Sequence, residues 1–166
     1  MSAEVIPLLA RRRAEAEVLS HVYDVVTEKF GADVAATVVA RAVEAAARQA
    51  GQAFAREAQA ERPSLQHFAE VVEIWRRQDS LEVVDLSLAG NELRFEVIRC
   101  RYVELYRELG LPPALAYTLS CSRDAAFAAG YSPFLSLERS ATLAEGSNGC
   151  RFRFLWGATA GVASSR

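Results

Sequence analysis

Apolar residues recur at helical spacing through the N-terminal half of the chain. Residues 8–29 and 32–59 are rich in alanine, valine and charged residues, and Gly31 separates the two segments. The expected buried stripes are Val18, Val22, Val25 and Val26 in the first segment, and Val34, Val38, Ala42, Ala45, Ala46 and Phe54 in the second. Two long helices are therefore predicted. Gly51 either weakens the second one locally or marks the close approach of another element.

A third helix is predicted over 65–77. Ser64 is a good N-cap, and Pro63 ends the preceding helix. The apolar stripe of this helix is Phe68, Val71, Val72 and Trp75. His67 near its start, like His21 in the first helix, is more typical of a surface or capping residue than of a ligand.

After Asp79 the apolar period changes from helical to alternating. Val84, Leu86 and Leu88 alternate with polar residues, and so do Leu93, Phe95 and Val97. Residues 89–92, Ala-Gly-Asn-Glu, form a turn signal between the two runs. This pattern predicts a β-hairpin.

The last third of the chain repeats the change from helix to strand. A helix over about 101–109 would end at Gly110, and Pro112-Pro113 would open another over about 114–129 that Gly130 stops. Two strands follow, about 134–143 and 150–156, joined by 145–149. The small and polar residues 158–166 are expected to be flexible.

The order ααα-ββ-αα-ββ predicts an α+β fold, with N-terminal helices packed against an antiparallel sheet of about four strands. A length of 166 residues favours one domain, 1–166. Within it we expect a helical half over 8–77 and a half carrying the sheet and the site over 80–157.

Composition narrows the range of partners. The net charge of −2 gives no electrostatic reason to expect nucleic acid, and Arg11, Arg12 and Arg13, followed by Glu15, indicate the solvated start of a helix. No secretory signal or membrane-length apolar run is visible. The odd number of cysteines, 3, favours reduced thiols in the cytoplasm.

Cys121, Asp124, Arg139 and Cys150 form the candidate site. In the predicted strands Arg139 shares a face with Leu135 and Leu137, and Cys150 shares a face with Phe152, Phe154 and Trp156, so both would point inward. Cys121 and Asp124 are three positions apart and would lie on one side of a helix. If the two strands pair directly, Cys150 would face about Thr142 or Ala144, with Arg139 roughly 10–17 Å away.

Two interpretations of these residues stay open. A buried guanidinium needs an anionic partner, so Arg139 and Asp124 would form a structural pair beside two core cysteines. Alternatively, a thiolate attacks an electrophilic carbon, a cation lowers the thiol pKa and a carboxylate moves protons. No cysteine or histidine spacing indicates a metal site, and no glycine-rich loop indicates a phosphate or dinucleotide cofactor, so none is expected.

The chain resembles the L-2-amino-thiazoline-4-carboxylic acid hydrolase family over about residues 20–156. The matching features are Cys100 before the amphipathic segment 101–110, Cys121-x-x-Asp124, Arg139-x-x-Thr142-Leu-Ala-x-Gly146, and Cys150-x-Phe152. The resemblance implies hydrolytic opening of a small cyclic amidine- or imine-type C–N bond in a substrate that carries a carboxylate. It implies that Cys121 or Cys150 attacks, Asp124 moves protons and Arg139, with Thr142 and Cys100, binds the substrate. Ser147, Asn148 and Arg151 stand where the family often has acidic residues.

Three hypotheses follow. The first is a cytoplasmic hydrolase with a cysteine nucleophile, or a related ring-forming or ring-opening enzyme of a specialised pathway. The second is a non-catalytic domain that binds a small ligand in the same pocket. The third is a partner subunit, with the alanine-rich helix 32–59 as the face of a homodimer.

Overall fold

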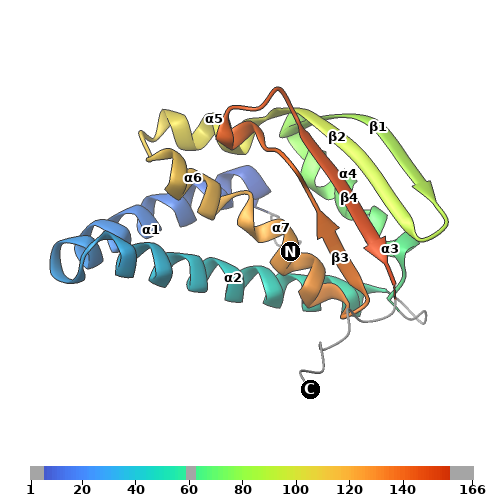
Figure 1. The fold of residues 1–166 in the computed structure, drawn as a ribbon, viewed down its shortest axis with the longest axis horizontal. Helices are drawn as coiled ribbons and strands as arrows, with labels where there is room; N and C mark the ends of the chain where they lie inside the picture. The colour runs from blue at the N-terminus through green and yellow to red at the C-terminus, as the bar shows by residue number, and fades with distance from the viewer. Residues whose placement is uncertain (1–5, 59–62, 158–166) are drawn as a thin grey trace, which may run out of the picture.

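The computed structural model describes residues 6–58 and 63–157, which form helices and one antiparallel sheet (Figure 1). The predicted α+β class is confirmed, and the four strands lie in the order β1-β2-β4-β3. The predicted flexible tail, 158–166, lies outside the described residues. The elements are α1 (Leu8–Phe30), α2 (Ala32–Glu57), α3 (Leu65–Ala69), α4 (Val71–Arg76), β1 (Leu81–Ala89), β2 (Glu92–Cys100), α5 (Arg101–Glu108), α6 (Pro113–Leu119), α7 (Ser122–Tyr131), β3 (Leu135–Glu138) and β4 (Cys150–Trp156).

The two long predicted helices exist, but their buried faces differ from the predicted ones. In α1 most of the expected stripe faces solvent, with Val18 63% and Val25 53% exposed; Val26 is half-buried, and Ala16 is buried. In α2 the buried positions begin one residue later than expected, at Ala35 and Val39. Helical spacing fits more than one face of an alanine- and valine-rich helix. The elements that pack against it decide which face is buried.

Helices α2 and α7 pack backbone to backbone, as Gly51 indicated. A Cβ atom at Gly51 would lie 2.1 Å from the Phe127 carbonyl oxygen, and one at Gly130 would lie 2.2 Å from the Arg48 carbonyl oxygen. The prediction that Gly130 stops the helix is therefore wrong, because α7 continues through it to Tyr131. The close crossing places α7 between α2 and the sheet (Figure 1).

The predicted helix 114–129 is divided at Ser120 and Cys121 into α6 and α7. The Arg123 Nε donates to the Leu119 carbonyl at 2.6 Å, taking the acceptor that an unbroken helix would offer to the Arg123 amide. That amide bonds to the Ser120 carbonyl instead, at 3.2 Å. The break turns the start of α7, with Cys121 and Asp124, toward the interior.

The predicted helix 65–77 is also divided, into α3 and α4. The Ser64 hydroxyl accepts the His67 amide at 3.2 Å, which confirms the predicted N-cap. His67, expected at the surface or in a cap, is half-buried, and its Nδ1 lies 2.8 Å from the Tyr131 hydroxyl. This contact joins the start of α3 to the end of α7.

The predicted hairpin β1–β2 is confirmed, but β3 is shorter than the predicted 134–143. Its last pair with β4 is Glu138 with Arg153, and the chain leaves the sheet at Arg139. The expectation that Cys150 faces Thr142 or Ala144 across a tight hairpin is therefore wrong. Residues 139–149 form a loop with one 3-10 turn, Leu143–Glu145, at its centre.

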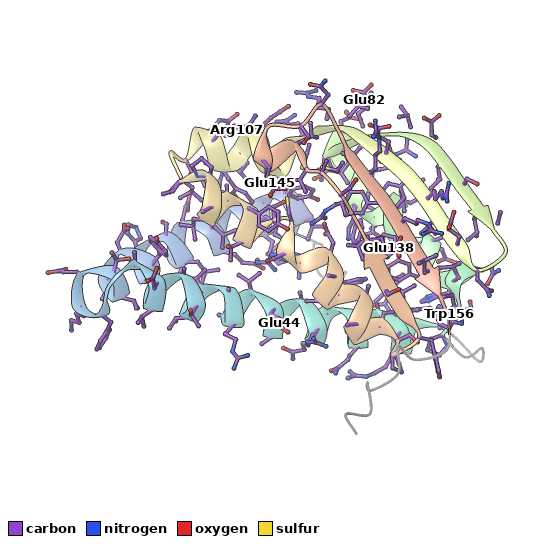
Figure 2. The ribbon with its side chains drawn as sticks, viewed as in Figure 1. Glu44, Glu82, Arg107, Glu138, Glu145 and Trp156 are labelled. Atoms are coloured by element: carbon purple, nitrogen blue, oxygen red, sulfur yellow. The ribbon has the colours of Figure 1, made fainter. Side chains whose placement is uncertain are left out.

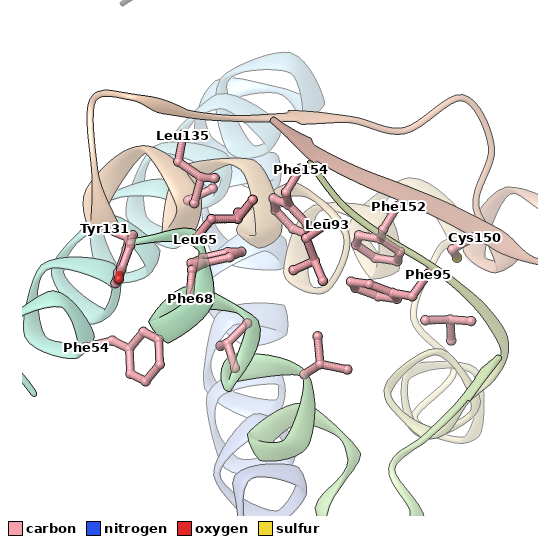
Figure 3. Close-up of a cluster of buried hydrophobic side chains, with 14 residues drawn as sticks. Phe54, Leu65, Phe68, Leu93, Phe95, Tyr131, Leu135, Cys150, Phe152 and Phe154 are labelled. Atoms are coloured by element: carbon pink, nitrogen blue, oxygen red, sulfur yellow. The ribbon is translucent and has the colours of Figure 1, made fainter. Parts of the chain in front are cut away.

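The inner faces of β2 and β4 carry the main apolar cluster. Phe95, Phe152 and Phe154 are buried there with Cys150 (Figure 3). Charged side chains, including Glu138, lie on the outer face (Figure 2). A second apolar cluster lies among α1, α2, α5 and α6, with Tyr106 at its centre. The candidate site lies where these two clusters meet.

Candidate functional site

A cavity of about 630 Å³ lies between the two apolar clusters. Five of the six predicted site residues line it: Cys100, Cys121, Asp124, Arg139 and Cys150. They come from β2, from α7 and the residue before it, from the loop after β3, and from the start of β4. The predicted residues therefore meet around one hollow.

Arg139 is held by three contacts within this cavity. Its Nη1 pairs with the Asp124 carboxylate, and its Nη2 donates to the Cys121 carbonyl at 2.8 Å. Its guanidinium carbon lies 5.0 Å from the centre of the Phe152 ring. Only 8% of the Arg139 side chain is exposed, so the inward orientation predicted from strand parity is confirmed although the strand itself ends at Glu138.

Burial and pairing act in opposite directions on Asp124. Burial raises its pKa to about 6, and the Arg139 guanidinium limits that rise. For Arg139, burial acts to lower the pKa, but the charges of Asp124 and Cys121 outweigh it and the pKa is raised. Near neutral pH the pair is therefore ionised, with a carboxylate that takes up a proton more readily than an ordinary aspartate.

The three thiols are all protonated in the resting protein. Burial, and then the Asp124 charge, raise the pKa of Cys121 to about 12, and burial raises that of Cys100 to about 11. Burial also raises the pKa of Cys150, while the Leu143 amide and the Arg139 charge oppose the rise. That amide donates to the Cys150 sulfur at 3.1 Å.

Thr142 is buried but is absent from the residues that line the cavity. Its hydroxyl donates to the Glu145 carboxylate at 2.7 Å and accepts the Glu145 amide at 3.3 Å. The loop is tied further by Arg107, whose Nη2 donates to the Leu143 carbonyl at 3.0 Å. Thr142 therefore stabilises the turn that presents the Leu143 amide to Cys150. The Thr-x-x-Glu spacing is the signal for this role.

A second ionic cluster, which the sequence pattern did not indicate, also lines the cavity. Glu15 of α1 accepts one bond from Arg12 and one from Arg123, each at 2.7 Å. The interpretation of 11–13 as a solvated helix start is wrong for Arg12, whose side chain is only 20% exposed. Burial, followed by the nearby Arg12 charge, lowers the pKa of Arg123. The i,i+3 spacing of Arg12 and Glu15 is common on solvated helices, so it could not identify this cluster.

Within residues 6–58 and 63–157, no group of three or more His, Cys, Asp or Glu side chains is placed to hold a metal ion. None of the described helices is both long and apolar enough to cross a membrane.

Comparisons with known proteins identify a family and a similar fold. The family model for L-2-amino-thiazoline-4-carboxylic acid hydrolase matches residues 11–154, which include all six predicted site residues. A comparison with curated proteins found no match. Among solved structures, the crystal structure of the phenol-responsive sensory domain of the transcription activator PoxR with phenol is similar, with a TM-score of 0.53 and 11% identity over 93% of this chain and 77% of that chain. At this identity the likeness concerns the fold alone.

Proposed function

The chain belongs to the L-2-amino-thiazoline-4-carboxylic acid hydrolase family, and on that premise we propose that it hydrolyses a C–N bond of a cyclic amidine or imine. Cys150 is the nucleophile, Asp124 moves the protons and Arg139 positions Asp124. The observation that carries the proposal is that these three side chains line one cavity large enough for a small molecule. The substrate class of the family is consistent with this set of groups.

Cys150 is the preferred nucleophile among the thiols of the cavity. Its sulfur receives the Leu143 amide, a donor that would stabilise negative charge developing on the sulfur. The charge of Arg139 acts in the same direction. The Asp124 charge raises the pKa of both thiols, but at Cys121 it is the largest effect after burial, whereas at Cys150 the Leu143 amide and the Arg139 charge come before it. Cys121 is therefore the second candidate.

Because the thiol is protonated at rest, its proton must leave as the sulfur attacks. Asp124 accepts this proton while sulfur bonds to the ring carbon and the C=N electron pair moves to nitrogen. Asp124 then gives the proton to that nitrogen. The C–N bond breaks with its electron pair on nitrogen, which takes a second proton that Asp124 carries from the amino group on the same carbon, and that amino nitrogen forms a C=N bond to the carbon. Water adds to this carbon through its oxygen while Asp124 carries one water proton to the imine nitrogen. The C–S bond then breaks as C=O forms, and the hydroxyl proton returns through Asp124 to the sulfur. The net change is the addition of one water molecule, and Asp124, with a pKa of about 6, suits both transfers.

The test is turnover of 2-amino-thiazoline-4-carboxylate and N-substituted cyclic amidines, followed by mass spectrometry for a product heavier by one water molecule. Cys150→Ser and Asp124→Asn are each expected to lower the rate by at least about a hundredfold, because each removes a group that takes part in proton transfer or attack. Arg151→Gln is the matched control, since Arg151 neighbours Cys150 but its side chain is 76% exposed.

Iodoacetamide labelling separates the two candidate nucleophiles. Near neutral pH, Cys150 is expected to react faster than Cys121 and Cys100, because its sulfur has the Leu143 donor. Loss of turnover in Cys121→Ser with full turnover in Cys150→Ser would move the nucleophile to Cys121. Slow, equal labelling of all three thiols together with no turnover would contradict the cysteine mechanism.

A non-catalytic binding domain is the second candidate function. The raised pKa values of all three thiols favour it, because none is a thiolate at rest. The similar PoxR structure is a phenol-responsive sensory domain with phenol, so a fold of this kind serves a sensory role in that protein. Ligand-induced thermal stabilisation with no product formed would support this candidate. Cytoplasmic location and homodimer formation stay predictions.

A further inference from the structure

The cavity is lined by charge at one end and by aromatic rings at the other. Arg123 and Asp124 lie at the start of α7, and Phe127 lies one turn further along the same helix. Around Phe127, the rings of Phe54 and Trp75 lie 5.9 and 5.8 Å away, centre to centre. All of these side chains line the same space. A ligand that fills the cavity therefore meets ionic groups and an apolar lobe at once.

The charged residues that line the cavity carry one more positive charge than negative. They are Arg11, Arg12, Arg123 and Arg139, with the carboxylates of Glu15, Glu57 and Asp124. Arg139 is occupied by Asp124 and the Cys121 carbonyl, whereas Arg12 bonds, among the residues that the structure describes, to Glu15. Burial lowers the pKa of Arg123, and the charge of nearby Arg12 lowers it further. A single anion bound beside Arg12 would neutralise the surplus and relieve this repulsion.

The whole cavity is larger than a small heterocycle requires. A volume of about 630 Å³ falls within the range of pockets for drug-sized ligands, about 300–1,000 Å³. Part of this space exists because α2 presents alanines, among them Ala46, Ala50 and Ala53, to the cavity. Ala50, Ala53 and Gln49 are also exposed, so the cavity reaches solvent along α2.

We propose that the cavity binds an amphiphilic monoanion, with its carboxylate beside Arg12 and Arg123 and an aromatic or branched aliphatic group in the lobe formed by Phe54, Trp75 and Phe127. This inference takes the cavity of the proposed function as the site and names its ligand class. The reacting C–N bond would lie between the two ends, next to Cys150 and Asp124. Arg139 is already bonded to Asp124 and the Cys121 carbonyl, so it positions Asp124, and the ligand carboxylate binds Arg12 instead.

Three probes test the inference by calorimetry without any turnover: 3-phenylpropanoate, its neutral amide 3-phenylpropanamide, and acetate. The phenyl carboxylate is expected to bind at least about tenfold more tightly than either of the others, since it alone satisfies both ends. Equal affinity for the carboxylate and the amide would overturn the anion subsite. Equal affinity for 3-phenylpropanoate and acetate would overturn the apolar lobe.

Substitutions at the two ends of the cavity test where the carboxylate and the phenyl group of the ligand bind. Arg12→Gln is expected to weaken 3-phenylpropanoate about tenfold and leave the amide unchanged, while Arg12→Lys keeps the preference for the carboxylate. Arg13→Gln is the matched control, because Arg13 pairs with Glu17 and Glu108 and is not among the residues that line this cavity. Ala50→Leu is expected to weaken 3-phenylpropanoate and leave acetate unchanged. An unchanged preference for the carboxylate in Arg12→Gln would contradict the placement at Arg12.

The binding and turnover measurements fail independently. Selective binding of 3-phenylpropanoate with no hydrolysis of any cyclic amidine would sink the proposed function and support the ligand class. Hydrolysis of a cyclic amidine, together with equal affinities for 3-phenylpropanoate, its amide and acetate, would support the proposed function and overturn the ligand class.

Discussion

The two ionic clusters of the cavity differ in how many guanidiniums share one carboxylate. Within residues 6–58 and 63–157, Asp124 is paired with Arg139 alone, and Arg139 also contacts the Cys121 carbonyl and the Phe152 ring. Glu15 is shared by Arg12 and Arg123, which leaves positive charge over. The pair of one arginine with one carboxylate has no net charge, and its contacts hold both side chains in place. The cluster of two arginines with one carboxylate has a net positive charge at the cavity wall, where it can bind an anionic ligand.

The largest expected effect on stability comes from removing the carboxylate of the Arg139–Asp124 pair. Asp124→Leu would leave Arg139 buried with its charge uncompensated, and arginine cannot lose its proton at ordinary pH. The free energy of unfolding, measured with urea, is expected to fall by about 3–5 kcal/mol. The double variant Asp124→Leu, Arg139→Leu is expected to be more stable than the single variant. A double variant as unstable as the sum of both single variants would show that the two side chains are not energetically coupled.

The pH dependence of the unfolding free energy tests the state of the Arg139–Asp124 pair separately. The folded-state pKa of Asp124, about 6, lies above its ordinary value of 3.8, so between these pH values the folded chain keeps a proton that the unfolded chain has lost. The Asp124 contribution therefore makes the unfolding free energy fall as pH rises from about 4 to about 6, and level off above. The full change is on the order of 3 kcal/mol. The signal is the difference between the wild-type and Asp124→Asn urea titrations, and parallel curves through this window would contradict it.

The smallest expected effect on stability comes from the cluster of Glu15 with Arg12 and Arg123. Glu15 is one-third exposed but its partner Arg123 is only 10% exposed, so Glu15→Gln is expected to lower the unfolding free energy by about 1–2 kcal/mol, less than Asp124→Leu does. The same substitution frees both arginines, and the affinity for 3-phenylpropanoate is expected to rise severalfold. Glu17→Gln is the control, because Glu17 lies on the exposed face of α1. A loss of affinity in Glu15→Gln would show that Glu15 orients the ligand instead of competing with it.

The patterns of β2 and β4 predicted orientation better than the pattern of α1 did. In residues 93–97 and 150–154, every second residue is apolar and the residues between are charged, so only one face can be buried, and Phe95, Phe152 and Cys150 lie inward. In α1, valines and alanines occupy several faces, and the stripe with Val18 and Val25 lies in solvent. Two-fold alternation is a choice between two faces, whereas a helix rich in small apolar residues offers several.

The site was predictable where a residue type was costly to bury. Arg139 on the apolar side of a strand required an anion, and Asp124 is that anion. Arg12, Glu15 and Arg123 carried no such signal, because charged residues at helical spacing are ordinary on a solvated surface. The role of Thr142 was visible in local spacing as a capping turn, although its resemblance-based role was substrate binding.

The sequence by itself determined the α+β order, the hairpin, the family and the inward direction of Arg139 and Cys150, since each depends on local periodicity or on a motif. The tertiary structure alone decided where β3 ends, that the sixth and seventh helices are separate, and that α1 brings Arg12 and Glu15 to the cavity. These features depend on contacts between segments far apart in the chain, such as the Arg123–Glu15 pair and the Gly51–Gly130 crossing. The spacing of apolar residues allows several faces of a helix to be buried, and contacts with other elements decide which face is.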